Sequence, residues 1–189
     1  VKGAVIVAII LVIGSLAVAY KGLIIAATVN GSPIMRLTVI GELEKASGKD
    51  LLDSLINERL IQNEASAKKI AVSDEEVNTD IKPIEAQITA QGSTLDKALA
   101  EQGMSMSDFR KRLILQKEVK KLLADKISVT DAEVAQFIKE NKPPIPKGEE
   151  AAAMSQIKDS LVNEKLKTET QNLLAELRSK ASIKYFVNY

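Results

Sequence analysis

The stretch VSDEEV at residues 72–77 decides how the chain folds, and VTDAEV at residues 129–134 echoes it. In the first stretch Ser73 stands three residues before Glu76, and the second repeats the spacing with a threonine. This spacing is typical of a capping box, in which the hydroxyl and the carboxylate each bind a free backbone N–H at the start of a helix. The acidic residues also favour the positive end of the helix dipole. Both stretches therefore predict the start of an amphipathic helix.

Most of the remaining chain is also predicted to be helical, because apolar residues recur every three or four positions. The first capping box opens a helix that contains Pro83, where proline should kink or split it. Gly48 is expected to break an earlier helical stretch in two. The predicted helices cover about residues 36–46, 51–69, 73–90, 95–102, 106–125, 130–141 and 149–180.

Two short segments, at residues 23–29 and 183–189, have the apolar character of strands. Asn30 and Gly31 follow the first segment and form a strong turn dipeptide. A lone strand is not stable, so we expect the two strands to pair with each other and to clasp the helices between them. The predicted fold is a mainly α-helical domain with a small two-stranded sheet made of the N- and C-terminal strands.

The N-terminus is uncharged and almost wholly apolar from Ala4 to Ala19, with a lysine on each side. As a helix this run would rise about 24 Å, slightly less than a bilayer core. We predict that residues 1–21 form a transmembrane signal anchor. A cleaved signal peptide is the main alternative, because AVA at residues 17–19 fits an A-x-A cleavage pattern; a buried helix of a soluble protein is the third. Either of the first two carries residues 22–189 across a membrane.

The composition argues against several classes of function. The 189-residue chain has 26 Lys and Arg against 25 Asp and Glu, which lacks the basic excess of a typical nucleic-acid binder. It has no His and no Cys, and so lacks the commonest general base, the thiolate nucleophile and the usual zinc ligands. No phosphate-binding glycine motif is present. We therefore predict no enzyme activity, no metal, no nucleotide and no other cofactor.

The order of several sequence pieces is more specific than any single one. These pieces are VNGSPI at 29–34, LLDSLINERLI at 51–61, the first capping box, LDKALAEQGMS at 95–105, FRKRL at 109–113 and the second capping box. As an ordered set they resemble the N-terminal chaperone domain of the SurA, PrsA and PpiD group of extracytoplasmic folding factors. The resemblance covers roughly residues 27–141, and the last helix and strand also fit it.

This resemblance implies a domain organisation, from which the chain departs in one place. Residues 22–141 would form the helical chaperone domain, which residues 149–189 complete with a long helix and a strand. Relatives usually carry a parvulin prolyl isomerase domain between these two parts, where this chain has only the proline-rich linker 142–148. We therefore expect no isomerase activity.

The resemblance implies an ATP-independent holdase that binds unfolded or newly translocated polypeptides in an apolar helical cradle. It would act at the cell membrane with residues 22–189 on the extracytoplasmic side, or as a secreted or periplasmic protein after signal cleavage. The alternative is a membrane-anchored structural subunit that holds one fixed partner. Methionine side chains suit the binding of varied apolar clients because they are flexible and polarizable. The candidate client-binding residues are Met104, Met106, Phe109 and Met154.

Overall fold

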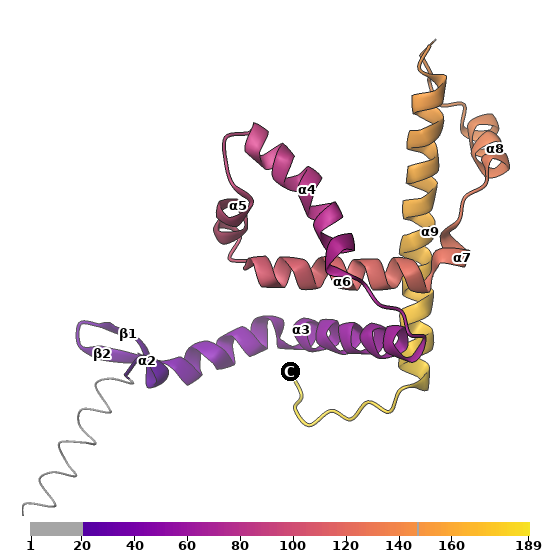
Figure 1. The fold of residues 1–189 in the computed structure, drawn as a ribbon. Coiled ribbons are helices and arrows are strands. Elements are labelled where there is room, and N and C mark those ends of the chain that lie inside the picture. Colours follow the sequence, from indigo (N-terminus) through magenta and orange to yellow (C-terminus); the bar gives the residue numbers. More distant parts are fainter. Residues whose placement is uncertain (1–20, 147) are drawn as a thin grey trace, which may run out of the picture. The chain divides into compact units, whose positions relative to one another are not determined.

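The computed structural model describes residues 21–146 and 148–189. Its elements are the short helix α2 (Lys21–Ile24), strands β1 (Ile25–Val29) and β2 (Ser32–Met35), and helices α3 (Arg36–Ala67), α4 (Asp74–Ala90), α5 (Leu95–Glu101), α6 (Met106–Leu122), α7 (Ala124–Ile127), α8 (Asp131–Asn141) and α9 (Glu150–Lys180). The prediction of a mainly helical fold with a small two-stranded sheet is thus confirmed (Figure 1).

The chain divides into two compact units. The described part of the N-terminal unit comprises residues 21–55 and 184–189, and the helical unit comprises residues 56–183. Helix α3 begins in the first unit and ends in the second. The predicted membrane-spanning segment lies outside the described residues, and none of the helices between residues 21 and 189 that the structure describes is long and apolar enough to cross a bilayer.

The sheet of the N-terminal unit is a local hairpin, so the predicted pairing of N- and C-terminal strands is wrong. β1 and β2 pair antiparallel, with Val29 opposite Ser32, and the last residues of the chain form no strand. Asn30 and Gly31 join the strands with φ of 50° and 84°, the left-handed conformations that a tight hairpin turn requires. Closing so short a loop costs far less entropy than joining the two ends of the chain.

Gly48 does not break the helix as predicted, because α3 continues through it. One glycine costs a helix only about 1 kcal/mol, which the flanking residues can offset. Its missing side chain leaves room for another group: a Cβ at Gly48 would come within 2.7 Å of the ring of Tyr189. The C-terminal residue therefore packs directly against the backbone of α3. Helix α4 likewise continues through Pro83 without a break.

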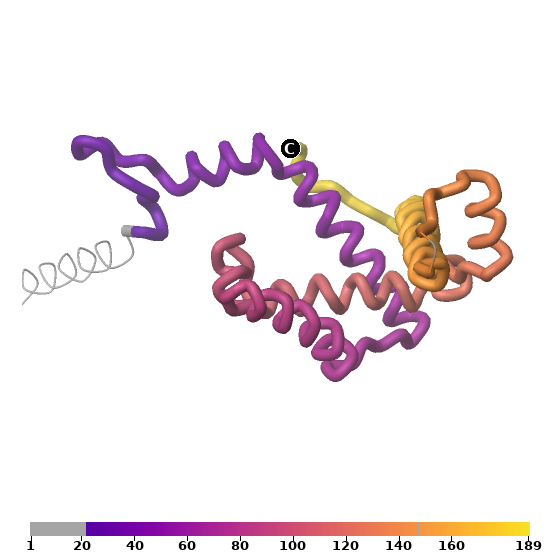
Figure 2. Tube along the Cα trace, turned by 90° about the horizontal axis from the view of Figure 1, so that it is seen from above, coloured from indigo at the N-terminus to yellow at the C-terminus, as the bar shows by residue number. Residues whose placement is uncertain are grey.

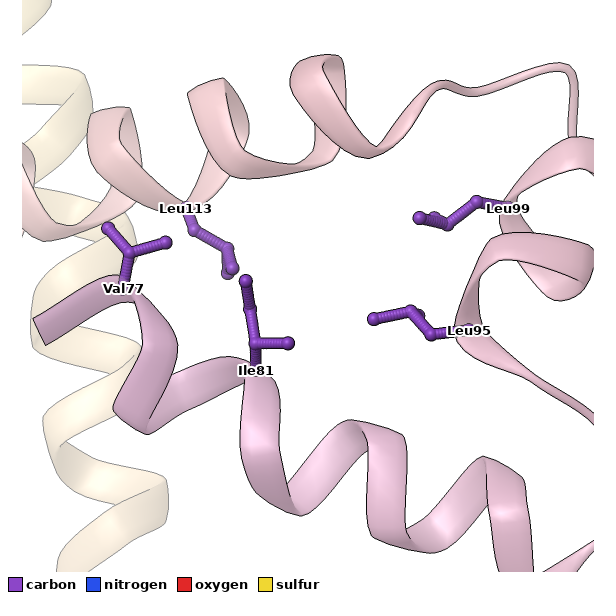
Figure 3. Close-up of a cluster of buried hydrophobic side chains, with 5 residues drawn as sticks. All are labelled: Val77, Ile81, Leu95, Leu99 and Leu113. Carbon is purple, nitrogen blue, oxygen red and sulfur yellow. The ribbon is translucent and has the colours of Figure 1, made fainter. Parts of the chain in front are cut away.

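Two apolar cores stabilise the helical unit. The first core joins α4, α5 and α6, and the second joins α3, the end of α6 and α9. Leu123, which follows α6, is 1% exposed in the second core. The first core consists of Val77, Ile81, Leu95, Leu99 and Leu113 (Figure 3).

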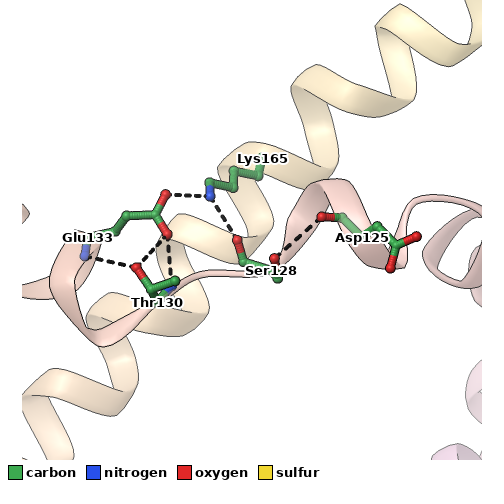
Figure 4. A network of polar contacts seen from close by, with 5 residues as sticks. All are labelled: Asp125, Ser128, Thr130, Glu133 and Lys165. Atoms are coloured by element: carbon green, nitrogen blue, oxygen red, sulfur yellow. Dashed lines mark hydrogen bonds and ion pairs between the residues drawn. The ribbon is translucent and has the colours of Figure 1, made fainter.

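Helix α8 lies beside α9 in both views of the fold (Figures 1 and 2). The second capping box is present as predicted, and Glu133 Oε2 accepts the backbone N–H of Thr130 at 2.8 Å. Lys165 of α9 donates to the other Glu133 oxygen at 2.6 Å and to the Ser128 carbonyl at 2.8 Å (Figure 4). The same carboxylate thus caps α8 and attaches it to α9.

Candidate functional site

A capping side chain stands at the start of each of the helices α4, α5 and α6. Ser73 accepts the Glu76 N–H at 3.2 Å and completes the first capping box. Thr94 caps α5 and Ser105 caps α6, where its hydroxyl accepts the Asp108 N–H at 3.1 Å. Such caps satisfy backbone donors that would otherwise lack a partner. The three capping residues thus determine where each helix begins. The start of a helix in turn determines which of its apolar side chains lie on the face toward the other two helices.

Ion pairs hold α4 against α6. Arg110 donates to Asp74 at 3.0 Å, and the Lys117 ammonium lies 2.9 Å from an Asp80 oxygen. The Lys121 ammonium lies 2.7 Å from Glu76. This ammonium, together with the Ser73 N–H, lowers the pKa of the Glu76 carboxyl to about 2. Glu76 therefore stays ionised at physiological pH and serves both the cap of α4 and its attachment to α6.

An apolar pocket of about 320 Å³ lies among these three helices, next to the first core. Figure 3 shows the core side chains of α4 and α6 facing those of α5. The pocket wall is apolar except for Gln102, Arg112 and Gln116. Its apolar lining residues are Ile84, Ile88, Leu95, Ala98, Leu99, Met104, Phe109 and Leu113.

The chemistry of the pocket suits an apolar guest. Its volume is at the lower end of the range typical of ligand sites, and a few polar groups stand among mostly apolar ones. The only charged side chain in its wall is Arg112, which is exposed. An apolar side chain can therefore enter the pocket, and a neighbouring carboxylate or backbone carbonyl of the same guest can meet the guanidinium or the amides.

The structure brings together only part of the predicted client-binding set. Met104 and Phe109 both line the pocket and are half-buried. Met106 packs against the first core but does not line the pocket. Met154 lies on α9, 42% exposed, and does not line this pocket.

The sequence analysis missed the contribution of α4. Ile84 and Ile88 of α4 are half-buried and line the pocket, although neither was among the candidate client-binding residues. Ala98 was also missed, because an alanine carries no sequence signal of an opening. The one available signal was the short length of α5, which has only seven residues to cover the apolar faces of α4 and α6.

A second hollow, of about 390 Å³, lies in the N-terminal unit along α3. Leu43, Leu51 and Leu55 border it and are each more than half exposed, and Tyr189 closes part of it. These leucines lie on the part of α3 that belongs to the N-terminal unit.

One buried carboxylate oxygen of the helical unit has no hydrogen-bond partner among the described residues. Glu118 Oε2, on α6, is buried and forms no hydrogen bond within the described residues. Burial, together with the nearby Glu58 carboxylate, raises the pKa of Glu118. Glu58 itself accepts a hydrogen bond from Gln62 at 3.0 Å. The contact between α3 and α6 therefore contains a destabilising pair of like charges.

The chain has no His and no Cys, and no group of three or more Asp or Glu side chains in residues 21–146 and 148–189 is arranged to hold a metal ion. The described residues form a mainly helical module with an open apolar pocket among α4, α5 and α6. Comparison with protein families extends this assignment. Residues 1–123 match the family described as the SurA-like N-terminal domain.

The chain belongs to the SurA-like N-terminal domain family, and the predicted resemblance is confirmed. The match covers the N-terminal domain of that family and no catalytic domain. Residue 141 ends α8 and residue 150 begins α9, so a short connection stands where the resemblance places a parvulin domain. Comparisons with curated proteins and with solved structures find no match.

Proposed function

We propose that the chain is an ATP-independent holdase that binds unfolded polypeptides through the pocket among α4, α5 and α6. The observation that carries the proposal is the apolar lining of this pocket, where buried leucines of the first core meet other apolar side chains that stay only half-buried. Family membership supports a chaperone-type role. Hydrophobic attraction is non-directional, so such a pocket accepts many side chains.

The expected affinity is modest. Burying one Leu or Phe side chain contributes about 1.5–3 kcal/mol. Micromolar binding corresponds to about 8 kcal/mol, so several contacts must act together. Weak binding suits a chaperone that releases its clients without nucleotide hydrolysis.

We further propose that the run from Ala4 to Ala19 attaches the protein to the membrane and that the described residues act on the extracytoplasmic side. The run is apolar and nearly long enough to span a bilayer. The family match begins at residue 1 and so includes this run. An anchor would hold the pocket where translocated polypeptides emerge.

The test is client binding by the full chain in lipid nanodiscs. Ala98→Leu should fill part of the pocket and weaken the binding of a labelled, permanently unfolded polypeptide roughly ten-fold, the loss expected from about 1.5 kcal/mol. Ala100→Leu is the matched control, because it makes the same change at an exposed position of α5. If both variants weaken client binding equally, or if neither weakens it, the pocket is not the client-binding site.

An aggregation assay and a salt series separate the holdase from a structural subunit. The wild-type chain should slow the aggregation of a denatured client at roughly stoichiometric amounts. Because hydrophobic contacts are not screened by salt, binding should change little as the ionic strength rises. No suppression at several-fold excess would favour a subunit that holds one folded partner, and loss of binding in salt would mean that charged helix faces hold the client.

A further inference from the structure

The charges of the chain are distributed unevenly. The first 41 residues contain no Asp or Glu, and their only charged side chains are Lys2, Lys21 and Arg36. Every acidic residue of the chain lies at Glu42 or later. The N-terminal end of the described structure is therefore purely cationic, although the whole chain is nearly neutral.

The same part of the structure exposes apolar side chains. Leu23 and Ile24 of α2 are 60% and 57% exposed, and Val29 of β1 is 58% exposed. Because β1 residue 27 pairs with β2 residue 34 and residue 29 with residue 32, Val29 and Ile34 share one face of the hairpin. No residue from 22 to 40 is buried. An isolated two-stranded hairpin is only marginally stable in water. Contact with another surface that covers this apolar face would therefore stabilise the hairpin.

The continuity of the chain indicates which surface that is. Helix α2 follows directly on the apolar run of residues 4–19, with Tyr20 between them. Tyrosine is enriched at membrane–water interfaces, and basic side chains near them are attracted to anionic lipids. If the run enters a bilayer, the exposed residues of α2 and the hairpin are held within a few residues of the headgroups.

We propose that α2 and the β1–β2 hairpin lie in the headgroup layer of an anionic phospholipid membrane, with their exposed apolar side chains toward the acyl chains. The partner is the lipid surface, which combines negative charge with an apolar interior and so matches both features of this segment. The proposal rests on the proposed membrane attachment but is independent of client binding. It gives the protein a second contact with the membrane beside the apolar run.

The chain has no Trp, so a single introduced tryptophan reports on its own surroundings. The full chain carrying Val29→Trp is reconstituted into vesicles of neutral and anionic phospholipid, with and without brominated acyl chains. The emission should shift to shorter wavelength and be quenched by brominated lipid. Met154→Trp is the matched control, because α9 belongs to the helical unit and this position is also partly exposed; its emission should stay unquenched.

A charge variant tests the role of the basic residues. Adding Arg36→Glu to the Val29→Trp chain should shift the equilibrium away from lipid contact about five-fold or more, as expected for the loss of one basic side chain near an anionic surface. Lys167→Glu, an exposed position on α9, should leave the quenching unchanged. Vesicles of neutral lipid alone should show weaker quenching than anionic ones.

Flotation of the vesicles distinguishes the possible failures. A chain that floats but shows no quenching at residue 29 overturns the proposal and leaves membrane attachment intact. A chain that does not float overturns both, and client binding through the pocket is measured separately. A blue-shifted emission that is insensitive to brominated lipid and disappears on dilution would assign the hairpin to contacts between copies of the chain, which also overturns the proposal.

Discussion

Replacing Glu118 by glutamine should stabilise the protein at neutral pH. Its Oε2 atom is buried and has no hydrogen-bond partner among the residues that the structure describes, and burial together with the Glu58 carboxylate raises its pKa. Glutamine has nearly the same shape and removes one of the two like charges. Its amide group can also donate a hydrogen bond where the carboxylate could only accept.

The expected gain follows from the cost of an unsatisfied buried group. Leaving such a group without a partner costs about 1–3 kcal/mol. Since Glu118 is only partly buried as a residue, we expect Glu118→Gln to gain about 1 kcal/mol, the lower end of that range. For a chain of this length that is a rise in melting temperature of roughly 2–4 °C.

The gain should also depend on pH in a defined direction. Because the folded pKa of Glu118 lies above its ordinary 4.5, the folded protein binds a proton there more tightly than the unfolded chain does. The wild type therefore gains stability as the pH falls from the raised pKa toward 4.5, while the variant does not. The difference in the free energy of unfolding between the variant and the wild type should be largest at neutral pH and should disappear as the pH falls toward 4.5.

Thermal unfolding followed by circular dichroism at several pH values measures this difference. Glu85→Gln, an exposed position on α4, is the control and should change stability by less than about 0.5 kcal/mol. The double variant Glu58→Gln/Glu118→Gln should gain less than the sum of the two single variants, because each relieves the same repulsion. A melting temperature that falls or stays the same in Glu118→Gln at pH 7 would refute the reasoning, as would a gain that persists at acidic pH.

Two further changes test other contacts. Glu133→Gln should lower the melting temperature at neutral pH, because the Lys165 ammonium and the cap of α8 hold the Glu133 pKa at about 2. This stabilisation is present above 4.5 and is lost as the pH falls toward 2, so the variant and the wild type should converge in acid, whereas exposed Glu164→Gln should have little effect at any pH. Gly48→Ala should bring no gain in the wild type, since its methyl group meets the Tyr189 ring, but should stabilise Tyr189→Ala by about 1 kcal/mol through helix propensity. A gain of equal size in both backgrounds, measured by thermal unfolding, would show that the ring does not oppose the methyl group.

The starts of α4, α6 and α8 could be predicted because they depend on neighbouring residues. Ser73 with Glu76, and Thr130 with Glu133, form their capping boxes as the spacing indicated. The start of α6 after Ser105 is equally local. In each case the stabilising hydrogen bonds join residues three positions apart, so the sequence contains all the information needed.

The contacts of the chain ends could not be predicted in the same way. Asn30 and Gly31 indicated a turn, but β2 has only four residues and contains Pro33, which hid the second strand of the hairpin. The close approach of Tyr189 to Gly48 joins residues far apart in sequence. No local pattern reports such a contact.

The pocket was predicted only in part for a different reason. A helical stripe of apolar residues indicates which face of α4 turns inward, but not whether another helix covers all of it. Ile81 is buried in the first core, whereas Ile88, on the same face, borders the pocket. The degree of closure depends on the short length of α5 and on the turns that position it.

The connection between α8 and α9 makes this fold tolerant of added sequence. Helices α8 and α9 contact each other, and only a short proline-rich segment joins them. Lys142, with φ of 45°, ends α8 and turns the chain away. The Glu133 carboxylate, which caps α8 and accepts from Lys165, attaches α8 to α9. A folded module whose ends lie close together could therefore be grafted between residues 142 and 149, to serve as a reporter or to add a new activity, while the pocket helices keep their arrangement.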